Sequence, residues 1–144
     1  MDLAPSVVRK IILEEHSQLR TKLDEIAKLI ENQDFGALQN ALREFSHFFL
    51  NHVAQEEKIL RPVLKDIDSW GNVRVDRMNQ EHAVQRKEIR QLDELISTGK
   101  PELYLRRTQV FLTELRKDME SEEKDCLSPT LLKDDPINVD YGSS

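Results

Sequence analysis

Six ionisable side chains occupy positions where a helical repeat of apolar residues would otherwise continue. They are His16, His52, Glu56, His82, Asp118 and Glu122. Burying one such group without a partner costs several kcal/mol. Imidazole and carboxylate are ligands of Fe, Mn and Zn, so six of them meeting in one core layer predict a dinuclear metal site. Pairing of histidinium with carboxylate, without a metal, is the alternative that the residues leave open.

An internal repeat of 66 residues relates these positions to one another. The pairs are His16 with His82, His52 with Asp118, and Glu56 with Glu122. The surrounding sequence repeats as well, because a Glu-His dipeptide is followed four residues later by Arg20 in the first half and by Arg86 in the second. The chain is therefore interpreted as a duplicated helical hairpin, in which Asp118 stands where the first half has His52.

Four amphipathic helices are expected to position these side chains. Apolar residues recur at steps of three and four, and the pattern is continuous only if the ionisable residues count as core positions. The expected helices run from near Pro5 to Asn32, from Phe35 to Leu64, from Val73 to Ser97 and from Pro101 to Leu127. Short connections between such helices predict an all-α, antiparallel up-down-up-down four-helix bundle over residues 1–132, followed by a C-terminal tail, 133–144.

An antiparallel arrangement would bring the ionisable residues to one level. His16 and His82 lie near the starts of the first and third helices, whereas Glu56 and Glu122 lie near the ends of the second and fourth. At a rise of about 1.5 Å per residue, all of them fall in a layer about 15 Å from one end of the bundle. The prediction is therefore a single site built from all four helices.

The composition argues against several classes of protein. The 144 residues include 21 basic and 27 acidic side chains, and the net charge of −6 disfavours nucleic acid as the main partner. No apolar run is long enough for a membrane span, and the first residues lack the layout of a signal peptide. Cys126 is the only cysteine, so no disulfide framework is expected and a reducing cytoplasm is the expected location.

The layout of these motifs resembles that of a hemerythrin-type (HHE) domain over residues 8–131. The resemblance rests on His52-x-x-x-Glu56, on the Glu-His dipeptide at His82, and on the repeat. It implies a four-helix bundle that holds two iron ions joined by an oxo or hydroxo bridge, with Mn or mixed Mn/Fe as alternatives. The implied ligands are Glu56 and Glu122 as bridges, His16 and His52 on one metal, and His82 and Asp118 on the other.

The chain departs from the pattern of oxygen-carrying hemerythrins at two positions. Asp118 replaces the histidine of the fourth helix, and Arg86 replaces the second histidine of the third helix. The metal near His82 would then be rich in carboxylate and incompletely filled. The resemblance therefore implies binding or sensing of O2, NO or peroxide rather than reversible oxygen carriage. The alternatives are an oxidase or oxygenase acting on a small substrate near Asp118, and a metal-free helical interaction module.

Several neighbouring residues are candidates for supporting roles. Gln85 occupies the position where the first half has Leu19, and it is either a hydrogen-bond donor to a ligand at the metal or a satisfied core amide. Four carboxylates beside the motif residues either orient the imidazoles or lie on solvated helix edges. They are Glu15, Glu57, Glu81 and Glu123.

Three further residues have simpler expected positions. His47 points away from the predicted core and is expected on the surface. Cys126 is expected to be a small buried core residue, with a redox-responsive thiol as the alternative. Trp70, in the middle connection, is expected to plug one end of the bundle.

Overall fold

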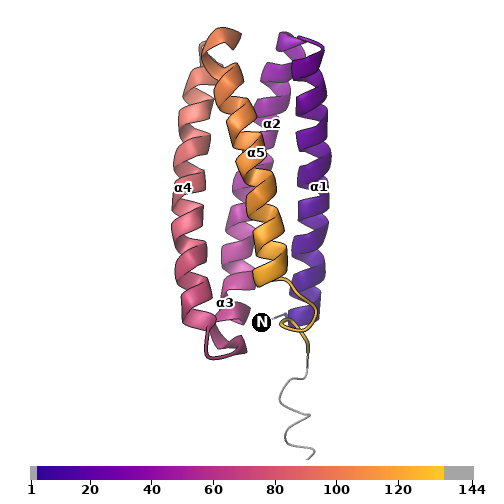
Figure 1. Cartoon of the computed structure of the whole chain (residues 1–144), viewed down its shortest axis with the longest axis vertical. Helices are drawn as coiled ribbons and strands as arrows, with labels where there is room; N and C mark the ends of the chain where they lie inside the picture. Colours follow the sequence, from indigo (N-terminus) through magenta and orange to yellow (C-terminus); the bar gives the residue numbers. More distant parts are fainter. Residues whose placement is uncertain (1–2, 135–144) are drawn as a thin grey trace, which may run out of the picture.

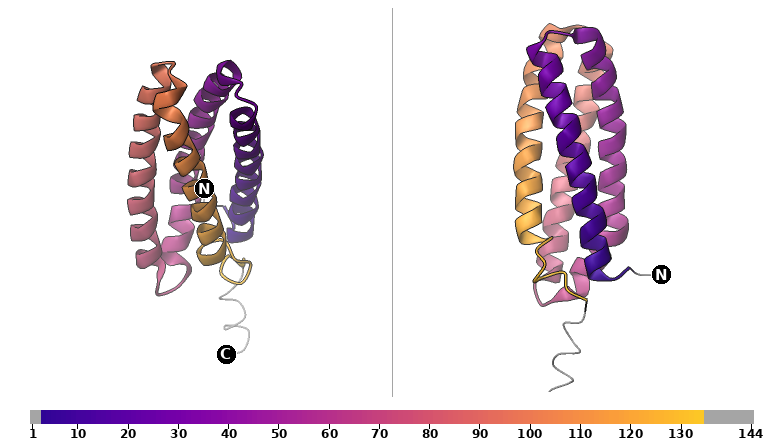
Figure 2. Two further views of the ribbon diagram at one scale, coloured as in Figure 1. Left: turned by 45° about the horizontal axis from the view of Figure 1, so that its top comes forward. Right: turned by 90° about the vertical axis from the view of Figure 1, so that its right-hand side faces the viewer.

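The computed structural model describes residues 3–134 and consists of four long helices (Figures 1 and 2). The helical elements are α1 (Pro5–Glu31), α2 (Phe35–Gln55), η1 (Glu56–Leu60), α3 (Arg61–Ile67), α4 (Gly71–Ser97) and α5 (Pro101–Asp125). Because α2, η1 and α3 follow one another without a break, they form one rod, which is the second helix of the bundle. Both α1 and α4 pack against α2 and α5, and successive helices run in opposite directions (Figure 1). The predicted all-α bundle is confirmed.

A layer of polar residues divides the hydrophobic core into two parts. On α1, Ile12 belongs to the lower core in Figure 1 and Leu19 to the upper core, with His16 between them. Each of the other three helices likewise has a polar residue between the two cores: Glu56 between Val53 and Leu60, His82 between Met78 and Ile89, and Glu122 between Met119 and Leu127. Close packing above and below holds the polar layer in place and limits the access of water to it.

The second rod contains a π-helical turn, η1, at the level of the polar layer. The N–H of Arg61 donates to the carbonyl of Glu56, five residues earlier. Pro62 follows, and a proline inside an α-helix loses one backbone hydrogen bond and clashes with the preceding turn. The wider π turn relieves that clash. The apolar pattern predicted one regular helix ending near Leu64, and it missed both this turn and the end of the rod at Ile67.

The turn between α3 and α4 depends on a glycine. A Cβ at Gly71 would overlap the backbone carbonyl oxygens of Leu64 and Lys65, so a residue with a side chain does not fit there without a backbone shift. α4 begins at this glycine, two residues earlier than the sequence pattern predicted. The tight turn holds the start of α4 beside α3 and brings His82 to the level of the polar layer.

The C-terminal end of the described chain caps the start of α1. The carboxylate of Asp134 accepts hydrogen bonds from the backbone N–H of Ser6 (2.8 Å) and from its hydroxyl group (2.6 Å). The N-cap residue Ala4 has no side-chain acceptor, so Asp134 satisfies an N–H that would otherwise lack a partner within the helix. The remainder of the predicted tail, 135–144, lies outside the described residues.

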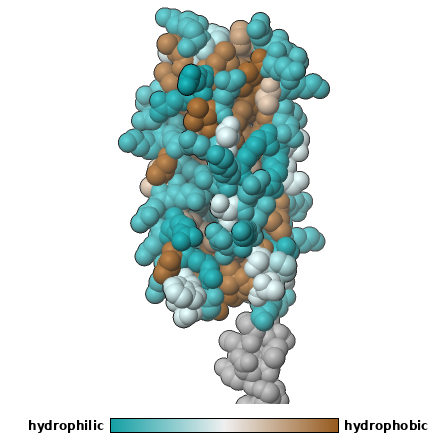
Figure 3. Space-filling model, viewed as in Figure 1, coloured by the Kyte–Doolittle hydropathy of each residue, from teal (hydrophilic) through white to brown (hydrophobic). Residues whose placement is uncertain are grey.

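The outer faces of the helices are mostly polar. The side of the molecule in Figure 3 is largely hydrophilic, with smaller apolar areas among the polar side chains. None of the helices in residues 3–134 has the length and apolar character needed to cross a membrane. The apolar residues of the helices are instead concentrated in the two cores.

Candidate metal centre

Three imidazoles direct the same ring nitrogen, Nε2, toward the centre of the polar layer. His16 Nε2 lies 2.9 Å from Glu122 Oε1, and His52 Nε2 lies 3.3 Å from Glu56 Oε2. His82 Nε2 lies 3.0 Å from Glu56 Oε1. All three rings are almost completely buried. The nitrogens are therefore directed at carboxylate oxygens, as ligands of a shared metal site would be.

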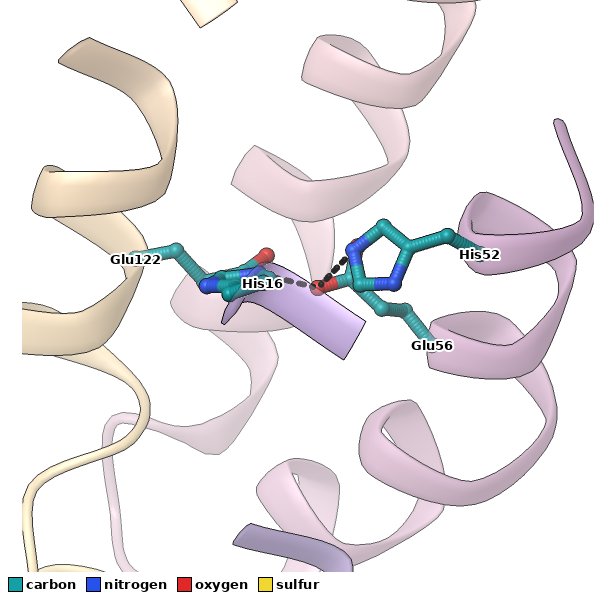
Figure 4. Close-up of side chains that lie close together, drawn as sticks. All are labelled: His16, His52, Glu56 and Glu122. Atoms are coloured by element: carbon teal, nitrogen blue, oxygen red, sulfur yellow. Dashed lines mark ion pairs between the residues drawn. The ribbon is translucent and has the colours of Figure 1, made fainter. Parts of the chain in front are cut away.

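Glu56 lies at the centre of this cluster and is only 3% exposed. One of its oxygens, Oε2, faces His52 and lies 3.7 Å from Nε2 of His16, while the other, Oε1, faces His82. One potential ligand atom from each of His16, His52, Glu56 and Glu122 lies within 4.8 Å of the others (Figure 4). The two oxygens of one carboxylate thus serve two sets of imidazoles, which is the arrangement expected of a bridging ligand.

An outer carboxylate holds the other ring nitrogen, Nδ1, of each histidine. The pairs are His16 with Glu123 (2.7 Å), His52 with Glu15 (2.6 Å) and His82 with Glu57 (2.9 Å). A hydrogen bond at Nδ1 fixes both the tautomer and the orientation of an imidazole, and leaves Nε2 to bind a metal. Of the two roles considered for these three carboxylates, the structure supports the orienting one.

Two of these outer pairs obey the internal repeat, including their arginine partners. Arg20 donates to Glu123 at 2.9 Å, and Arg86 donates to Glu57 through two hydrogen bonds of 2.6 Å. The guanidinium of Arg86 and the imidazole of His82 hold the pKa of Glu57 at about 2, although burial acts in the opposite direction. Glu57 is therefore ionised at neutral pH and is a strong acceptor for the Nδ1–H of His82.

Asp118 and Gln85 form a different arrangement, at the place where the repeat would put a fourth histidine. The side-chain amide nitrogen of Gln85 lies 3.1 Å from Asp118 Oδ2 and 3.4 Å from Glu81 Oε1. Burial raises the pKa of Glu81 to about 7, and the nearby charge of Asp118 contributes. Burial also raises the pKa of Asp118. Glu81 thus faces another carboxylate rather than an imidazole.

A small cavity brings this arrangement together with the predicted ligands. Its volume is about 10 Å³, which is about the space of a single water molecule. Besides His16, His52, Glu56 and Glu122, it is lined by Phe49, Glu81, Gln85, Leu115, Asp118 and Met119. Five of the six predicted metal ligands, and Gln85, therefore line one space, while His82 contacts Glu56 beside it. From the sequence, Glu81 was expected either to orient an imidazole, like its repeat partner Glu15, or to lie on a solvated helix edge; the structure instead places it at this cavity.

The electrostatics of the cluster reflect buried charges close together. Burial lowers the pKa of His16, but the carboxylates of Glu122 and Glu56 raise it, to about 10. Burial likewise lowers the pKa of His52, but Glu15 and Glu56 raise it to about 9. Burial and the charge of Glu56 raise the pKa of Glu122 well above its usual value. Without a metal, protons on these groups balance the charge of the layer.

Protons alone leave two buried atoms of the cluster unsatisfied. Within residues 3–134, His16 Nε2 and Glu56 Oε2 have no hydrogen-bond partner of suitable geometry. Buried polar atoms in proteins are nearly always hydrogen-bonded. A cation in contact with both atoms would satisfy them, so the donor set fits a metal ion better than it fits internal pairing of histidinium and carboxylate.

The three remaining sequence predictions have mixed outcomes. His47 is exposed, as predicted. Cys126 is only partly buried, at the end of α5, and burial together with Glu122 raises the pKa of its thiol to about 12. The prediction for Trp70 is wrong, because its side chain is 61% exposed. The lower end of the core is closed instead by apolar residues that include Leu64, Leu127 and Leu132.

Four antiparallel helices that direct buried imidazoles and carboxylates into one layer define a metal-binding helical bundle. Comparison with protein families identifies the group more closely. The Hemerythrin HHE cation binding domain family matches residues 7–128, and the chain belongs to this family. No match was found among curated proteins or among solved structures.

Proposed function

We propose that this chain is a non-haem dinuclear iron protein that binds or senses O2, NO or peroxide. One observation supports this proposal above the others. The two oxygens of Glu56 are divided between the pair His16 and His52 on one side and His82 on the other. A carboxylate in that position is suited to bridging two metal ions.

The proposed ligand sets follow from this division. His16 and His52 would hold one metal, His82 and Asp118 would hold the other, and Glu56 with Glu122 would bridge them. The iron pair, with its oxo or hydroxo bridge, would supply electrons and open coordination positions for a small ligand. Mn or mixed Mn/Fe occupancy uses the same donors. A cytoplasmic location remains a prediction of the sequence.

The protein part of the site favours a small ligand. The cavity beside the carboxylates has a volume of only about 10 Å³, and Phe49, Leu115 and Met119 contribute its apolar wall. An organic substrate would need a larger space, so the oxidase or oxygenase alternative is the weaker proposal. The amide of Gln85 lines the same cavity. Because its nitrogen donates to Asp118 and Glu81, it would have to give up one of these contacts to donate to a diatomic ligand.

The test is metal analysis of the full chain, purified in air and under anaerobic conditions. We expect about two irons per chain and, in air, near-ultraviolet charge-transfer absorption from an oxo bridge. A colourless protein without bound transition metal would refute the proposal. Two histidines of α2 provide a matched pair of variants: His52→Ala should lose metal, whereas His47→Ala, at an exposed position, should retain it.

Addition of NO to the reduced protein, followed by optical and electron paramagnetic resonance (EPR) spectroscopy, tests the choice of ligand. A new iron–nitrosyl signal is expected. If the iron is present but neither NO, O2 nor peroxide changes the spectra, the ligand part of the proposal is wrong while the metal part stands.

A further inference from the structure

Of the four outer contacts that the internal repeat predicts, three are formed and the fourth is not. Three histidines each give Nδ1 to an outer glutamate, as in the pair His52 and Glu15 at 2.6 Å. The repeat places Asp118 where His52 stands and Glu81 where Glu15 stands. Because Asp118 has no N–H to donate, Glu81 cannot have the role that Glu15 has. Glu81, in the second half, therefore has no imidazole to orient at this position.

The side chains around Glu81 suggest what replaces that task. Gln85 takes the place of an apolar Leu19 in the repeat, and its amide nitrogen donates to Asp118 Oδ2 and Glu81 Oε1. It thereby holds the two carboxylates side by side. Within residues 3–134, neither carboxylate forms an ion pair with an arginine, a lysine or a histidine. Two adjacent carboxylates are an unfavourable arrangement when both are ionised, unless a cation binds between them; in the metal-free protein a proton has to take that place.

An independent observation points into the same space. The cavity that Glu81 and Asp118 line is also lined by Glu56 and His16, which are 3% and 1% exposed. Glu56 Oε2 and His16 Nε2 lack hydrogen-bond partners of suitable geometry in the described part of the chain. The two unsatisfied atoms lie on the side of the first metal position, and the unpaired carboxylates of Glu81 and Asp118 border the same cavity. The cavity thus connects Glu81 with the dinuclear site as a whole.

We propose that Glu81 is a further ligand of the second metal, beside His82 and Asp118, and that Gln85 positions it. This inference rests on the dinuclear site proposed above. It makes the two metal positions unequal: the first has two imidazoles, whereas the second has one imidazole and additional carboxylate oxygens. Oxygen-rich sites suit harder cations such as Mn²⁺, whereas imidazole-rich sites suit the later metals.

The experiment is a titration of the metal-free full chain with Mn²⁺, in which EPR measures the unbound ion. Three proteins are compared: the natural chain, Glu81→Gln, and Glu94→Gln as a control that removes one acidic charge from an exposed position of the same helix. We expect about two bound ions for the natural chain and for the control. Glu81→Gln should keep the first ion and bind the second at least roughly tenfold more weakly.

A second background separates ligation from a general effect of charge. The substitution Asp118→His restores the repeat, and its new imidazole gives Glu81 a hydrogen bond to accept, as Glu15 does. In this background Glu81→Gln still leaves an acceptor for the new imidazole, so it should weaken binding of the second ion less than it does in the natural chain. An equal loss in both backgrounds would overturn the assignment of Glu81 as a ligand. Circular dichroism of each metal-free variant verifies that it is folded.

The outcomes distinguish this inference from the function on which it rests. If the natural chain binds two ions and Glu81→Gln behaves like Glu94→Gln, Glu81 is not a ligand and the dinuclear site stands. If the natural chain binds fewer than two ions under all conditions, both proposals are wrong.

Discussion

Binding of the first metal ion should release at least two protons near pH 7. In the metal-free protein the pKa values of His16 and His52 are about 10 and about 9, so both rings are protonated at neutral pH. A metal can bind Nε2 only after that nitrogen loses its proton, while Nδ1–H stays with Glu123 or Glu15. Each ring therefore gives up one proton, and the raised pKa of Glu122 adds a further source.

The cost of this proton release can be estimated from the pKa values. Summed over the two rings, the pKa values exceed pH 7 by about five units. At about 1.36 kcal/mol per unit, loss of the two protons opposes metal binding by about 7 kcal/mol. The opposition falls as the pH rises. Between about pH 6 and pH 8.5 the apparent affinity for the metal should therefore increase about a hundredfold per pH unit.

Calorimetry in two buffers of different ionisation enthalpy measures the number of protons directly. One equivalent of Zn²⁺, which has no redox chemistry, is the suitable probe. Glu15→Gln keeps a hydrogen-bond acceptor but removes the charge that raises the pKa of His52, so its proton release at pH 8 should be smaller. His47→Ala should match the natural chain. Release of fewer than one proton, or an affinity independent of pH, would refute the reasoning.

Three further predictions concern the metal-free protein. Gly71→Ala should lower the free energy of unfolding in urea by about 1–3 kcal/mol, because its Cβ meets backbone oxygens; a loss below about 0.5 kcal/mol would mean that the turn adjusts freely. The pKa of Glu57 is lowered to about 2, so its contribution to stability is present above pH 4.5 and is lost as the pH falls toward 2. The unfolding free energy of Glu57→Gln, measured in urea, should fall less steeply over that interval, and equal slopes would contradict this. The pKa of Glu81 is raised to about 7, so the folded state holds a proton that the unfolded state has lost, and stability falls between pH 4.5 and 7. Glu81→Gln should remove that fall. Between pH 5 and pH 7.5 its unfolding free energy should therefore improve, relative to that of the natural chain, by about 2 kcal/mol after allowance for solvent screening. Thermal melts of both proteins at both pH values measure this difference, and an equal pH dependence would contradict it.

Periodicity was sufficient to predict the four helices and the common level of the proposed ligands. The steps of three and four place His16 and His82 on the core face, and short connections leave few arrangements other than an antiparallel bundle. The π turn at Glu56 left no such signal, because it changes the backbone within an apolar pattern that continues on both sides. Its only trace in the sequence is Pro62, which a kink or a helix end would explain equally well.

The outer carboxylates could not be assigned from the sequence because each contacts a histidine of another helix. Glu15 of α1 contacts His52 of α2, and Glu123 of α5 contacts His16 of α1. Adjacency in sequence, as in Glu15 and His16, is therefore misleading: neighbours along a helix point about 100° apart. Which glutamate reaches which ring depends on helix rotation and spacing, and these are determined only when all four helices pack.

The broken repeat ties the chemistry of the site to its stability. A metal-free layer of three imidazoles and several carboxylates separates two apolar cores, and its imidazoles and Glu56 are buried away from water. Three of its corners compensate through His–Glu pairs, but the corner of Asp118 and Glu81 has only the amide of Gln85. If Asp118, in place of the histidine that the repeat predicts, merely weakened metal binding, position 85 would be expected to keep an apolar residue, as at the equivalent Leu19. A buried amide that holds two carboxylates together instead keeps an oxygen-rich corner ready for a cation, at the expense of the metal-free fold.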